Sequence, residues 1–506
     1  MTADQLPVIV LRADGFGARR ALIDSIGSWT YEDLAARAEH LAGVLLDGRQ
    51  DLEDARVALL ASPGSPYVAG QWGTWMAGGV SVPLSPQQTP PEWEHILDDG
   101  LITEAVVSPE HAAAFVPLAA ARAIRITTTA LGVSLPSPAA GGLASWPAVG
   151  PMRRALMLYT SGTTSRPKGV VLTHANLAAQ IECLTEAWEW GPDDWTLHVL
   201  PLNHTHGVIN VLACALWNGA TCELEGGFDA GRVWQRLAGG VISVFMAVPT
   251  IYSRLIAAWR EVPPDVREAW SRGAARLRLF VSGSAALPVP VLEEWRAITG
   301  HTLLERYGMT EIGMALSNPL HGVRRPGVVG SPLPNVEVRI VNEAGEDVAG
   351  GAPGELLVRG PGVFGEYWGR PNATAAAFAE GGWFRTGDVA ACEGGAFRIL
   401  GRLSVDIIKS GGEKVSALEV ESVLREHPAI ADCAVVGLPD PEWGECVAAV
   451  VALRAQATLA LPGLRDWARA RLSGPKLPRK LVTVPALPRN AMGKVVKTQL
   501  IQLFGD

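Results

Sequence analysis

The chain has 506 residues, of which 48% are hydrophobic and 19% are charged, and its formal net charge is -8 at pH 7. Because a single hydrophobic core rarely grows beyond about 250–300 residues, we expect one large and one smaller folded unit. The acidic balance argues against a nucleic-acid-binding protein, which would present a basic face to phosphates.

The cysteines and the N-terminal segment predict the compartment. Six cysteines are scattered singly without a C-x-x-C pair, which argues against a zinc knuckle or a disulfide framework and favours a reducing environment. The first twenty residues carry early acidic residues and a short apolar run, unlike a secretory signal or a transit peptide. No apolar stretch reaches the roughly 20 residues that a membrane span needs, so we expect a cytoplasmic protein with no membrane partner.

Helical patterns alternate with short apolar runs along the first 300 residues. The segment "TYEDLAARAEHLAGVLL" (30–46) begins with a potential capping residue, Thr30, and repeats apolar residues at helical spacing, which predicts an amphipathic helix. Several strand-length runs precede helical patterns: "ARVALLA" (55–61), "AVVS" (105–108), "LMLYTSG" (156–162), "TLHVLPL" (196–202), "VISVFMAVP" (241–249) and "LRLFVSG" (277–283). This alternation predicts layered α/β sheets.

The sequence pattern of the chain changes after about Gly350. Short, Gly-punctuated and aromatic-rich segments predict antiparallel strands with tight turns, forming a small β-barrel-like part. Beyond Arg402 the pattern gives a helix, a strand and another helix. We therefore expect residues 1–402 to form a large N-terminal domain and residues 403–506 a small α+β domain; residues 127–151, rich in Pro, Gly, Ser and Ala, are expected to be a loop.

The segment "YTSGTTSRPKG" (159–169) predicts a phosphate-binding loop. It follows a strand-like run and precedes a helical pattern (173–188), and a Gly- and hydroxyl-rich turn between strand and helix offers N–H groups and hydroxyls to an anion. Lys168 adds a positive charge. The motif G-x-x-x-x-G-K-[ST] of nucleoside triphosphatases fails at Pro167 and Gly169. An ordinary surface turn is the alternative, since Ser, Thr, Gly and Pro are common turn residues.

The whole loop resembles the phosphate loop of the adenylate-forming superfamily, which includes acyl-CoA synthetases, luciferases and peptide-synthetase adenylation domains. Five further motifs resemble those of the family and occur in its order: "SGSAALP" (282–288), "ERYGMTE" (305–311), "WFRTGD" (383–388), "GRLSVDIIKSGGEKVSALEVE" (401–421) and "PRNAMGK" (488–494). The resemblance covers nearly the whole chain. It implies an N-terminal domain that binds ATP and the acyl group, and a mobile C-terminal domain that carries a catalytic lysine.

The family's reaction has two steps: a carboxylate attacks the α-phosphate of ATP and expels pyrophosphate, and a thiol then attacks the acyl-adenylate. Catalysis of such steps is largely positioning and charge stabilisation. The resemblance implies that Lys494, Thr310 and Glu311 are catalytic and that Glu311 helps to hold Mg²⁺. The residues that it places around ATP are Thr160, Ser161, Gly162, Thr163, Thr164, Lys168, Gly283, Ser284, Ala285, Glu305, Arg306, Tyr307, Gly308, Thr310, Asp388 and Arg402.

Each of these residues also has an ordinary structural interpretation. Asp388 could be a turn residue, Glu311 a charge at the start of a helix and Lys494 an exposed lysine near the C-terminus. We favour the functional interpretation because the residues occur together and in the family's order.

By the same resemblance, the small domain rotates between the two steps. Lys494 serves the first step, Gly411 and Gly412 line the thiol tunnel in the second, and Ser404 is the hinge. The family usually has Asp or Lys at the hinge position. It also has Gly where this chain has Ser165, and serine resists a positive φ.

The segment "RLRLFVSGSAAL" (276–287) predicts the kind of acid. Strand alternation places Arg278 on the same face as Ser282, so a cation points along the face that ends in the acyl-pocket motif. Arginine can hold a carboxylate through two parallel hydrogen bonds, whereas a monocarboxylate would leave it buried and unpaired. A substrate with a second carboxylate is therefore predicted. The alternative is that Arg278 faces outward and has its own partner.

This segment and "LPLNHTHGVINVLACALWNGA" (200–220) resemble malonyl-CoA synthetases, the dicarboxylate branch of the family. That resemblance implies that Arg278 and His206 bind the distal carboxylate of malonate, with Ser282 nearby and Met309 beside the central carbon. Asn203 replaces a histidine common in that branch. His204 and His206 could instead form half a zinc site, although the sequence offers no obvious further ligands.

The resemblance thus implies an AMP-forming ligase that uses ATP, Mg²⁺ and CoA to activate malonate, with methylmalonate a further candidate. We expect a monomer or weak homodimer. One alternative is a ligase for another small or aromatic acid, or an enzyme that loads a carrier protein. The other is a catalytically silent nucleotide-binding scaffold, against which the presence of Glu311, Asp388, Arg402 and Lys494 together argues.

Overall fold

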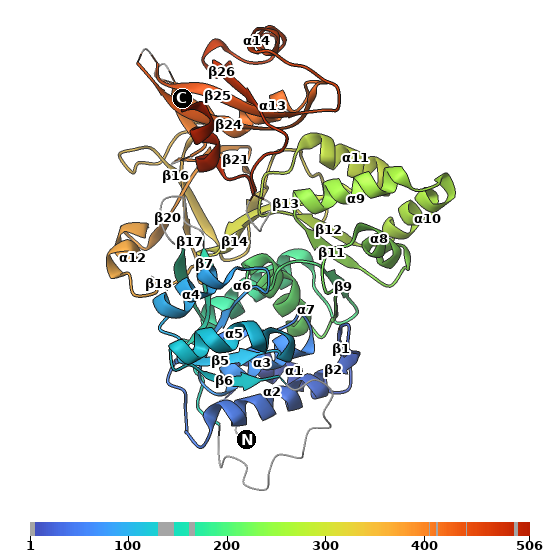
Figure 1. The fold of residues 1–506 in the computed structure, drawn as a ribbon, viewed down its shortest axis with the longest axis vertical. Helices are drawn as coiled ribbons and strands as arrows, with labels where there is room; N and C mark the ends of the chain where they lie inside the picture. The colour runs from blue at the N-terminus through green and yellow to red at the C-terminus, as the bar shows by residue number, and fades with distance from the viewer. Residues whose placement is uncertain are drawn as a thin grey trace.

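The computed structural model describes residues 6–129, 146–160, 167–403, 405–410, 413–441, 443–489 and 494–505. Within these residues the chain forms four β-sheets with helices between and around them (Figure 1). Three sheets precede Arg402 and the fourth follows it. The predicted mixed α/β fold, with a large N-terminal part and a small α+β C-terminal part, is confirmed.

A nine-stranded sheet carries the residues that matter most for the site. Its order is β15-β14-β13-β12-β11-β9-β10-β1-β2, and the strands from β13 to β1 are parallel. The strands are β1 (Arg20–Ile23), β2 (Ser28–Thr30), β9 (Trp195–His198), β10 (Thr221–Leu224), β11 (Val244–Ala247), β12 (Leu279–Ser282), β13 (Leu304–Met309), β14 (Gly313–Ser317) and β15 (Ser331–Pro332).

A seven-stranded sheet lies at the N-terminal end of the molecule in Figure 1, in the order β18-β8-β7-β4-β3-β5-β6. The strands from β7 to β6 are parallel and the two at the β8 edge are antiparallel. The strands are β3 (Arg56–Leu60), β4 (Val80–Pro83), β5 (Glu104–Val107), β6 (Arg125–Thr128), β7 (Arg154–Thr160), β8 (Lys168–Thr173) and β18 (Glu366–Tyr367).

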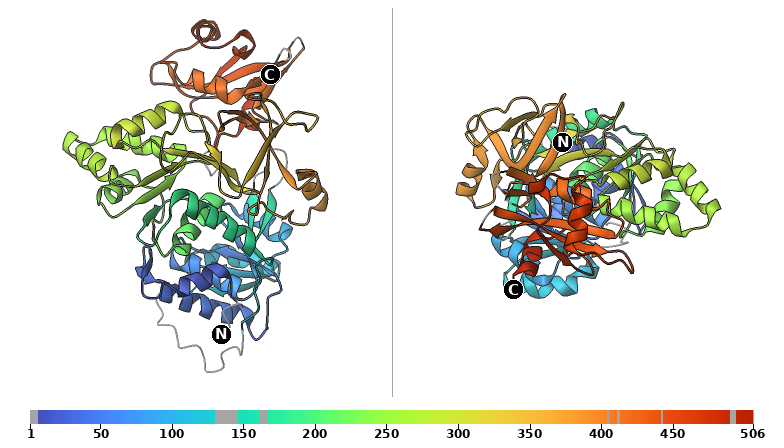
Figure 2. Two further views of the ribbon diagram at one scale, coloured as in Figure 1. Left: turned by 180° about the vertical axis from the view of Figure 1, so that it is seen from behind. Right: turned by 90° about the horizontal axis from the view of Figure 1, so that it is seen from above.

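Two five-stranded sheets complete the fold. The first is antiparallel and matches the Gly-punctuated segments: β16 (Glu337–Val341), β17 (Gly354–Arg359), β19 (Phe378–Ala379), β20 (Trp383–Glu393) and β21 (Ala396–Arg402). The second is the C-terminal sheet: β22 (Ile407–Ser410), β23 (Glu413–Ser416), β24 (Ile430–Asp440), β25 (Gly444–Leu453) and β26 (Lys480–Thr483). Seen from above, the C-terminal part lies over the middle of the molecule (Figure 2).

Helices fill the space between and outside the sheets. The long helices are α2 (Tyr31–Leu46), α3 (Ser65–Met76), α4 (Pro90–Asp99), α5 (Pro109–Ala121), α6 (His174–Trp188), α8 (Ala230–Ala238), α9 (Pro249–Glu261), α10 (Pro264–Ala274) and α11 (Val289–Thr299). The others are α1 (Val8–Asp14), the π-helix η2 (His206–Ala213), α7 (Cys214–Trp217), α12 (Pro371–Ala377), α13 (Ala417–Leu424), α14 (Leu461–Ala468), η3 (Gly474–Lys476), α15 (Lys497–Ile501) and η4 (Gln502–Phe504).

The main core joins the two large sheets through α2, α3 and α6. Leu22 and Leu197 of the nine-stranded sheet and Val57 and Leu156 of the seven-stranded sheet belong to one buried cluster. Every residue of α3 is buried, including Trp72 and Trp75, which explains its nearly uninterrupted apolar character. The C-terminal sheet has cores of its own.

The predicted helix at residues 30–46 is α2. The Thr30 hydroxyl accepts a hydrogen bond from the Asp33 backbone N–H, and the Asp33 carboxylate accepts one from the Thr30 backbone N–H. This capping box fixes the start of the helix. Most of the loop expected at 127–151 lies outside the described residues. Among the described helices, none has both the length and the apolar character that spanning a bilayer requires.

One local prediction was wrong. The strand β7 is followed by a second strand and not directly by a helix, because β8 pairs with β7 in an antiparallel arrangement in which Thr160 lies opposite Lys168. Helix α6 begins only at His174. The run "GVVLT" has the β-branched character of a strand, so the anion-binding expectation rests on the β7–β8 pair and not on a helix N-terminus.

Candidate functional site

The candidate site forms where β12 and β13 end. The carboxyl ends of parallel strands are the usual place for ligand binding in such sheets. Ser282 is the last residue of β12 and is completely buried, and Gly283 follows it. Thr310 and Glu311 follow β13, and the Thr205 hydroxyl lies 3.4 Å from that of Thr310.

Arg306 on β13 is a buried cation in this region. It is 4% exposed, and its Nε and Nη2 atoms have no hydrogen-bond partner within the described residues. A Cβ on Gly283 would lie 2.4–2.6 Å from the Arg306 guanidinium, so only glycine leaves room for it there. Burial lowers the pKa of Arg306. A buried cation without a partner is costly, which points to an anion from outside the protein.

His206 stands next to this cation. Its Nδ1 lies 3.2 Å from the Ser284 hydroxyl, and its Nε2 is buried without a partner among the described residues. Burial, reinforced by the positive charge of Arg306, lowers the pKa of His206 well below its ordinary value, so the ring is neutral. A Ser284 hydroxyl that donates to Nδ1 leaves the ring proton on Nε2, where it can be donated to a ligand. Ser284 has a positive φ of 70°, strain that is typical of functional sites.

Asn210 is a polar residue that sequence reasoning missed. It is fully buried, and neither its amide nitrogen nor its amide oxygen has a partner within the described residues. It lies four residues after His206 in η2. A π-helix, with bonds from residue i to i+5, has more than four residues per turn, so Asn210 projects on nearly the same side as His206. Its signal in the sequence was a lone asparagine inside the apolar run "GVINVLA".

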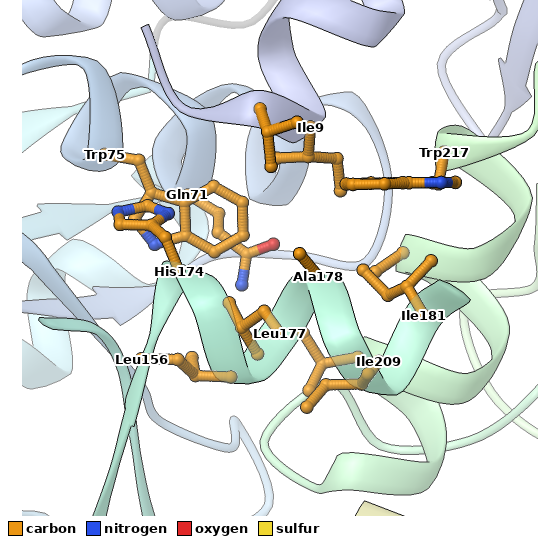
Figure 3. A pocket seen from close by; sticks show the side chains of 13 residues that line it. Ile9, Gln71, Trp75, Leu156, His174, Leu177, Ala178, Ile181, Ile209 and Trp217 are labelled. Atoms are coloured by element: carbon orange, nitrogen blue, oxygen red, sulfur yellow. The ribbon is translucent and has the colours of Figure 1, made fainter. Parts of the chain in front are cut away.

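A cavity on the other side of η2 is not the substrate site. It is lined by Val208, Ile209 and Ala213 of η2 and by side chains of α1, α3 and α6, including Trp75 and His174 (Figure 3). Its volume of about 20 Å³ suits about one water molecule. The π winding separates the two sides of η2, because an α-helix would bring residue i+7, Ala213, beneath His206.

Three of the predicted ATP-binding residues contact one another. Asp388 and Arg402 lie opposite each other on β20 and β21, and Arg402 Nε donates to Asp388 Oδ1 at 2.9 Å. The Tyr307 hydroxyl donates to Asp388 Oδ2 at 2.6 Å. Asp388 is 7% exposed. The Tyr307–Asp388 hydrogen bond joins the small antiparallel sheet to β13, and the two hydrogen bonds together fix the carboxylate in one orientation.

A tyrosine links two other predicted residues. The Tyr367 hydroxyl donates to Glu311 Oε1 at 2.9 Å, and the Lys168 ammonium lies 5.3 Å from the centre of the Tyr367 ring. Burial raises the pKa of Glu311. Tyr367 was missed because "GEYWGRP" was interpreted only as strands and turns.

The carboxylate of Glu311 has the chemistry of a Mg²⁺ ligand. Among the described residues, no group of three or more His, Cys, Asp or Glu side chains could hold a metal by itself. Mg²⁺ takes one or two carboxylates and completes its shell with phosphate oxygens and water.

Lys494 lies near Arg402, Asp388 and Arg306, although it belongs to the C-terminal part. It keeps contact with solvent, yet desolvation by the surrounding protein, with the charges of Arg402 and Arg306, lowers its pKa, and Asp388 opposes this shift. Lys494 in turn contributes to the lowered pKa of His204, whose main cause is burial. The structure therefore brings Lys494 to the residues of β13, β20 and β21.

Arg278 lies elsewhere, and the prediction that it faces the acyl pocket was wrong. It precedes β12, at the opposite end of the strand from Ser282, which is roughly 13 Å away at about 3.3 Å per residue. Its Nε and Nη2 donate to the two carboxylate oxygens of Asp194 at 2.7 and 2.6 Å, and its Nη1 donates to the Trp188 carbonyl. Strand alternation concerns only the face of a strand and says nothing about the distance along it.

The remaining predicted residues differ in position. Glu305 is buried on β13, and Leu287 N–H donates to its Oε1 at 3.4 Å. Met309 is half-buried at the end of β13, and Ala285 is exposed after β12. A Cβ on Gly308 would meet the Gly313 carbonyl at 2.1 Å, so the irregular β13–β14 pairing requires glycine. Seven predicted residues lie outside the described ones: Ser161, Gly162, Thr163, Thr164, Ser404, Gly411 and Gly412.

Comparison with known proteins identifies related enzymes. Residues 11–368 match the family model of AMP-binding enzymes, and residues 419–494 match the AMP-binding enzyme C-terminal domain. The chain is 46% identical to the mitochondrial malonate–CoA ligase of Bos taurus over 98% of this chain and 90% of that protein.

Two solved structures are similar. ATP-bound MatB from Rhodopseudomonas palustris is 34% identical, with a TM-score of 0.89 over 100% of this chain and 99% of that chain. A malonyl-CoA ligase in a ternary product complex with methylmalonyl-CoA and AMP is 36% identical, with a TM-score of 0.68 over 94% and 97%. The protein therefore belongs to the family of AMP-binding, adenylate-forming enzymes.

Proposed function

We propose that this protein is an AMP-forming malonate–CoA ligase that converts malonate, ATP and CoA to malonyl-CoA, AMP and pyrophosphate. The sequence similarity to the Bos taurus malonate–CoA ligase covers almost the whole chain. The observation that carries the proposal is Arg306, a buried guanidinium whose Nε and Nη2 lack a partner among the described residues. A dicarboxylic acid supplies the missing anion while its other carboxylate reacts.

Arg306, which the resemblance placed around ATP, replaces Arg278 as the proposed ligand of the distal carboxylate. Arg278 already holds Asp194, whereas Arg306 lies beside Gly283, His206 and Ser282 at the strand ends. His206 Nε2 and the Ser282 hydroxyl are buried and unpartnered within the described residues, so both are available to the same carboxylate. A monocarboxylate would leave all three polar groups unsatisfied, and this selects against it.

The first step joins an oxygen of the near carboxylate to the α-phosphorus of ATP and breaks the bond to pyrophosphate. We propose that the Asp388–Arg402 pair holds the ribose, that Thr310 faces the α-phosphate and that the Lys494 ammonium stabilises negative charge on the reacting oxygens. Residues 160–168 would hold the outer phosphates. Mg²⁺, held by Glu311 and by the phosphates, would supply charge neutralisation.

The second step forms a bond between the CoA sulfur and the acyl carbon and releases AMP. We propose that residues 403–506 rotate about Ser404 as a unit relative to residues 1–402, which withdraws Lys494 and brings Gly411 and Gly412 to the thiol tunnel. The product complex with methylmalonyl-CoA and AMP supports this: it is slightly more identical to this chain than MatB, yet its TM-score is 0.68 against 0.89. A rotated small domain accounts for such a difference.

The first experiment is pyrophosphate release with ATP and Mg²⁺ for acetate, propionate, malonate, methylmalonate, succinate, benzoate and octanoate, each with and without CoA. We expect a CoA-dependent signal that is largest with malonate. A maximum with a monocarboxylate would contradict the role of Arg306 but not the reaction type. ATP binding without pyrophosphate release for any acid would identify a silent nucleotide-binding protein.

The same assay with a phosphopantetheinylated carrier protein in place of CoA tests the alternative acceptor. We expect free CoA to be preferred.

We further propose a monomer or weak homodimer in a reducing compartment such as the cytoplasm. All six cysteines are free thiols, which suits a reducing compartment, and light scattering together with cell fractionation checks both points.

A further inference from the structure

Lys497 is a buried cation that the proposed chemistry does not use. It begins α15, three residues after Lys494, and its side chain is only 11% exposed. Its ammonium lies 2.5 Å from Asp406 Oδ1 and 2.8 Å from Glu421 Oε1. Burying a lysine between two carboxylates requires close geometry, since the desolvation cost is offset only by well-placed partners.

The two carboxylates fix different parts of the chain. Glu421 is on α13 and is held by the Val435 backbone N–H, which donates to its Oε1 at 2.9 Å, and by Arg425. It therefore belongs to the framework of the C-terminal sheet. Asp406 lies between β21 and β22, on the connection between the N-terminal and the C-terminal sheets.

Asp406 also contacts the proposed ATP site. Its Oδ2 accepts a hydrogen bond from the backbone N–H of Arg402 at 3.1 Å, and its own backbone N–H donates to the Arg402 carbonyl at 2.8 Å. The Arg402 side chain holds Asp388. A continuous series of contacts therefore runs from Asp388 through Arg402 and Asp406 to Lys497.

Two backbone contacts join the ends of the segment that carries Lys494, just before Lys497. Arg489 pairs with Val495 in an isolated antiparallel bridge, and the Val496 backbone N–H donates to the Pro488 carbonyl at 2.9 Å. Lys497 directly follows these contacts, and its ammonium pairs with Asp406 and Glu421.

We infer that Lys497 is a positioning residue for Lys494. Its two ion pairs attach the end of the segment that carries Lys494 to Asp406, between β21 and β22, and to Glu421 on α13. Rotation of the C-terminal part therefore moves Lys494 together with these elements. This inference rests on the proposed role of Lys494 in adenylate formation. Misplacing a catalytic group by about 1 Å can cost about 10²-fold in rate.

The test separates the two half-reactions in the full-length protein. Lys497→Met should lower the rate of malonyl-adenylate formation by about 10²-fold, with the KM values for ATP and malonate changed by less than about threefold. Thioester formation from preformed malonyl-adenylate, which does not use Lys494, should stay within about threefold of the wild-type rate. Lys497→Arg, which keeps both ion pairs, should recover most of the adenylation rate.

A second variant guards against a folding defect. Asp406→Asn weakens only one of the two contacts and leaves Lys497 paired with Glu421, so it should fold and should lower adenylation by about tenfold without affecting thioester formation. Equal loss of both half-reactions in the folded variants, or no loss in either, would overturn the inference.

Lys494→Ala, assayed in parallel, distinguishes this failure from that of the proposed function. If Lys494→Ala separates the half-reactions and the Lys497 and Asp406 variants do not, only the positioning role is wrong. If Lys494→Ala does not separate them, the role of Lys494 is wrong and the positioning role fails with it.

Discussion

At the scale of single residues, the candidate site depends on buried polar atoms that the described protein leaves unsatisfied. Arg306, His206, Asn210 and Ser282 all have such atoms. Buried polar groups are normally paired, so several exceptions near one another indicate where a charged ligand binds. Arg278, by contrast, is fully paired and is a structural residue.

Arg306→Met should lower kcat/KM for malonate by about 10²-fold, equivalent to roughly 3 kcal/mol, because the distal carboxylate loses its cation. The effect on the KM for ATP should be much smaller. Arg278→Met is the matched control: it should reduce thermal stability by leaving the Asp194 carboxylate without its cation, while the KM for malonate stays unchanged. Steady-state kinetics of both variants decide the assignment, and a selective effect on malonate in Arg278→Met would reverse it.

Gly283→Ala should act through Arg306. The new methyl group would lie 2.4–2.6 Å from the guanidinium, and since this is the end of a flexible side chain, we expect the guanidinium to move and the fold to persist. The KM for malonate should rise with little change in melting temperature. Gly283 has no side chain that could bind malonate, so the substitution acts only by displacing Arg306. An unchanged KM for malonate would show that the position of Arg306 is not critical.

Glu305 predicts a pH dependence of stability. Burial raises its pKa from 4.5 to about 7, and hydrogen bonds from backbone N–H groups only partly offset this. The folded state therefore favours the protonated carboxyl, a contribution to stability that is complete below pH 4.5 and is lost as the pH rises through about 7. Relative to Glu305→Gln, the free energy of unfolding of the wild type should fall by about 3 kcal/mol across this window. Denaturant titrations at several pH values measure the difference, and parallel pH profiles would contradict the shift.

At the scale of elements, local sequence determined where most helices and strands form but not how each one is wound or connected. The capping box at Thr30 starts α2 as predicted. The π winding of η2, which places His206 and Asn210 away from the cavity side, has no comparable signal in the run "HGVINVLA". Likewise, β7 is followed by β8 and not by a helix, because β8 pairs with β7 in the same sheet.

Thr30→Ala should lower the free energy of unfolding by about 1 kcal/mol, because the Asp33 N–H loses its acceptor. Hydrogen exchange should accelerate first in the opening turn of α2. Thr30→Ser keeps the hydroxyl and should remain close to the wild type in both measurements. A serine variant as unstable as the alanine variant would show that the methyl group, and not the cap, is responsible.

At the scale of the whole molecule, the structure brings the C-terminal part over the strand ends, so that Lys494 lies among charges from β13, β20 and β21. We propose that this is the adenylate-forming arrangement. The Asp388–Arg402 contact and the Asp406 connection lie where the N-terminal sheets meet the C-terminal sheet. Movement between the parts must therefore reorganise contacts near residues 402–406.

Lys494→Ala should abolish malonyl-adenylate formation, with a loss of at least about 10²-fold, while thioester formation from preformed malonyl-adenylate stays within a few-fold of the wild type. The reason is that, in the proposed mechanism, Lys494 stabilises charge only while the small domain is in its first position. Rapid-quench measurements of the two half-reactions check this. Equal loss in both would contradict a two-position mechanism.

The sequence by itself determined the layered α/β fold, because capping and periodicity are local properties, and its resemblance to the adenylate-forming superfamily named Asp388, Arg402, Glu311 and Lys494 as candidates. Only the tertiary structure decided which arginine faces the strand ends. Arg278 and Arg306 are both charged residues at sheet strands, and their roles differ because one meets Asp194 while the other is enclosed beside Gly283. Burial and partnership depend on residues far apart in the chain, so they emerge only when the sheets are packed together.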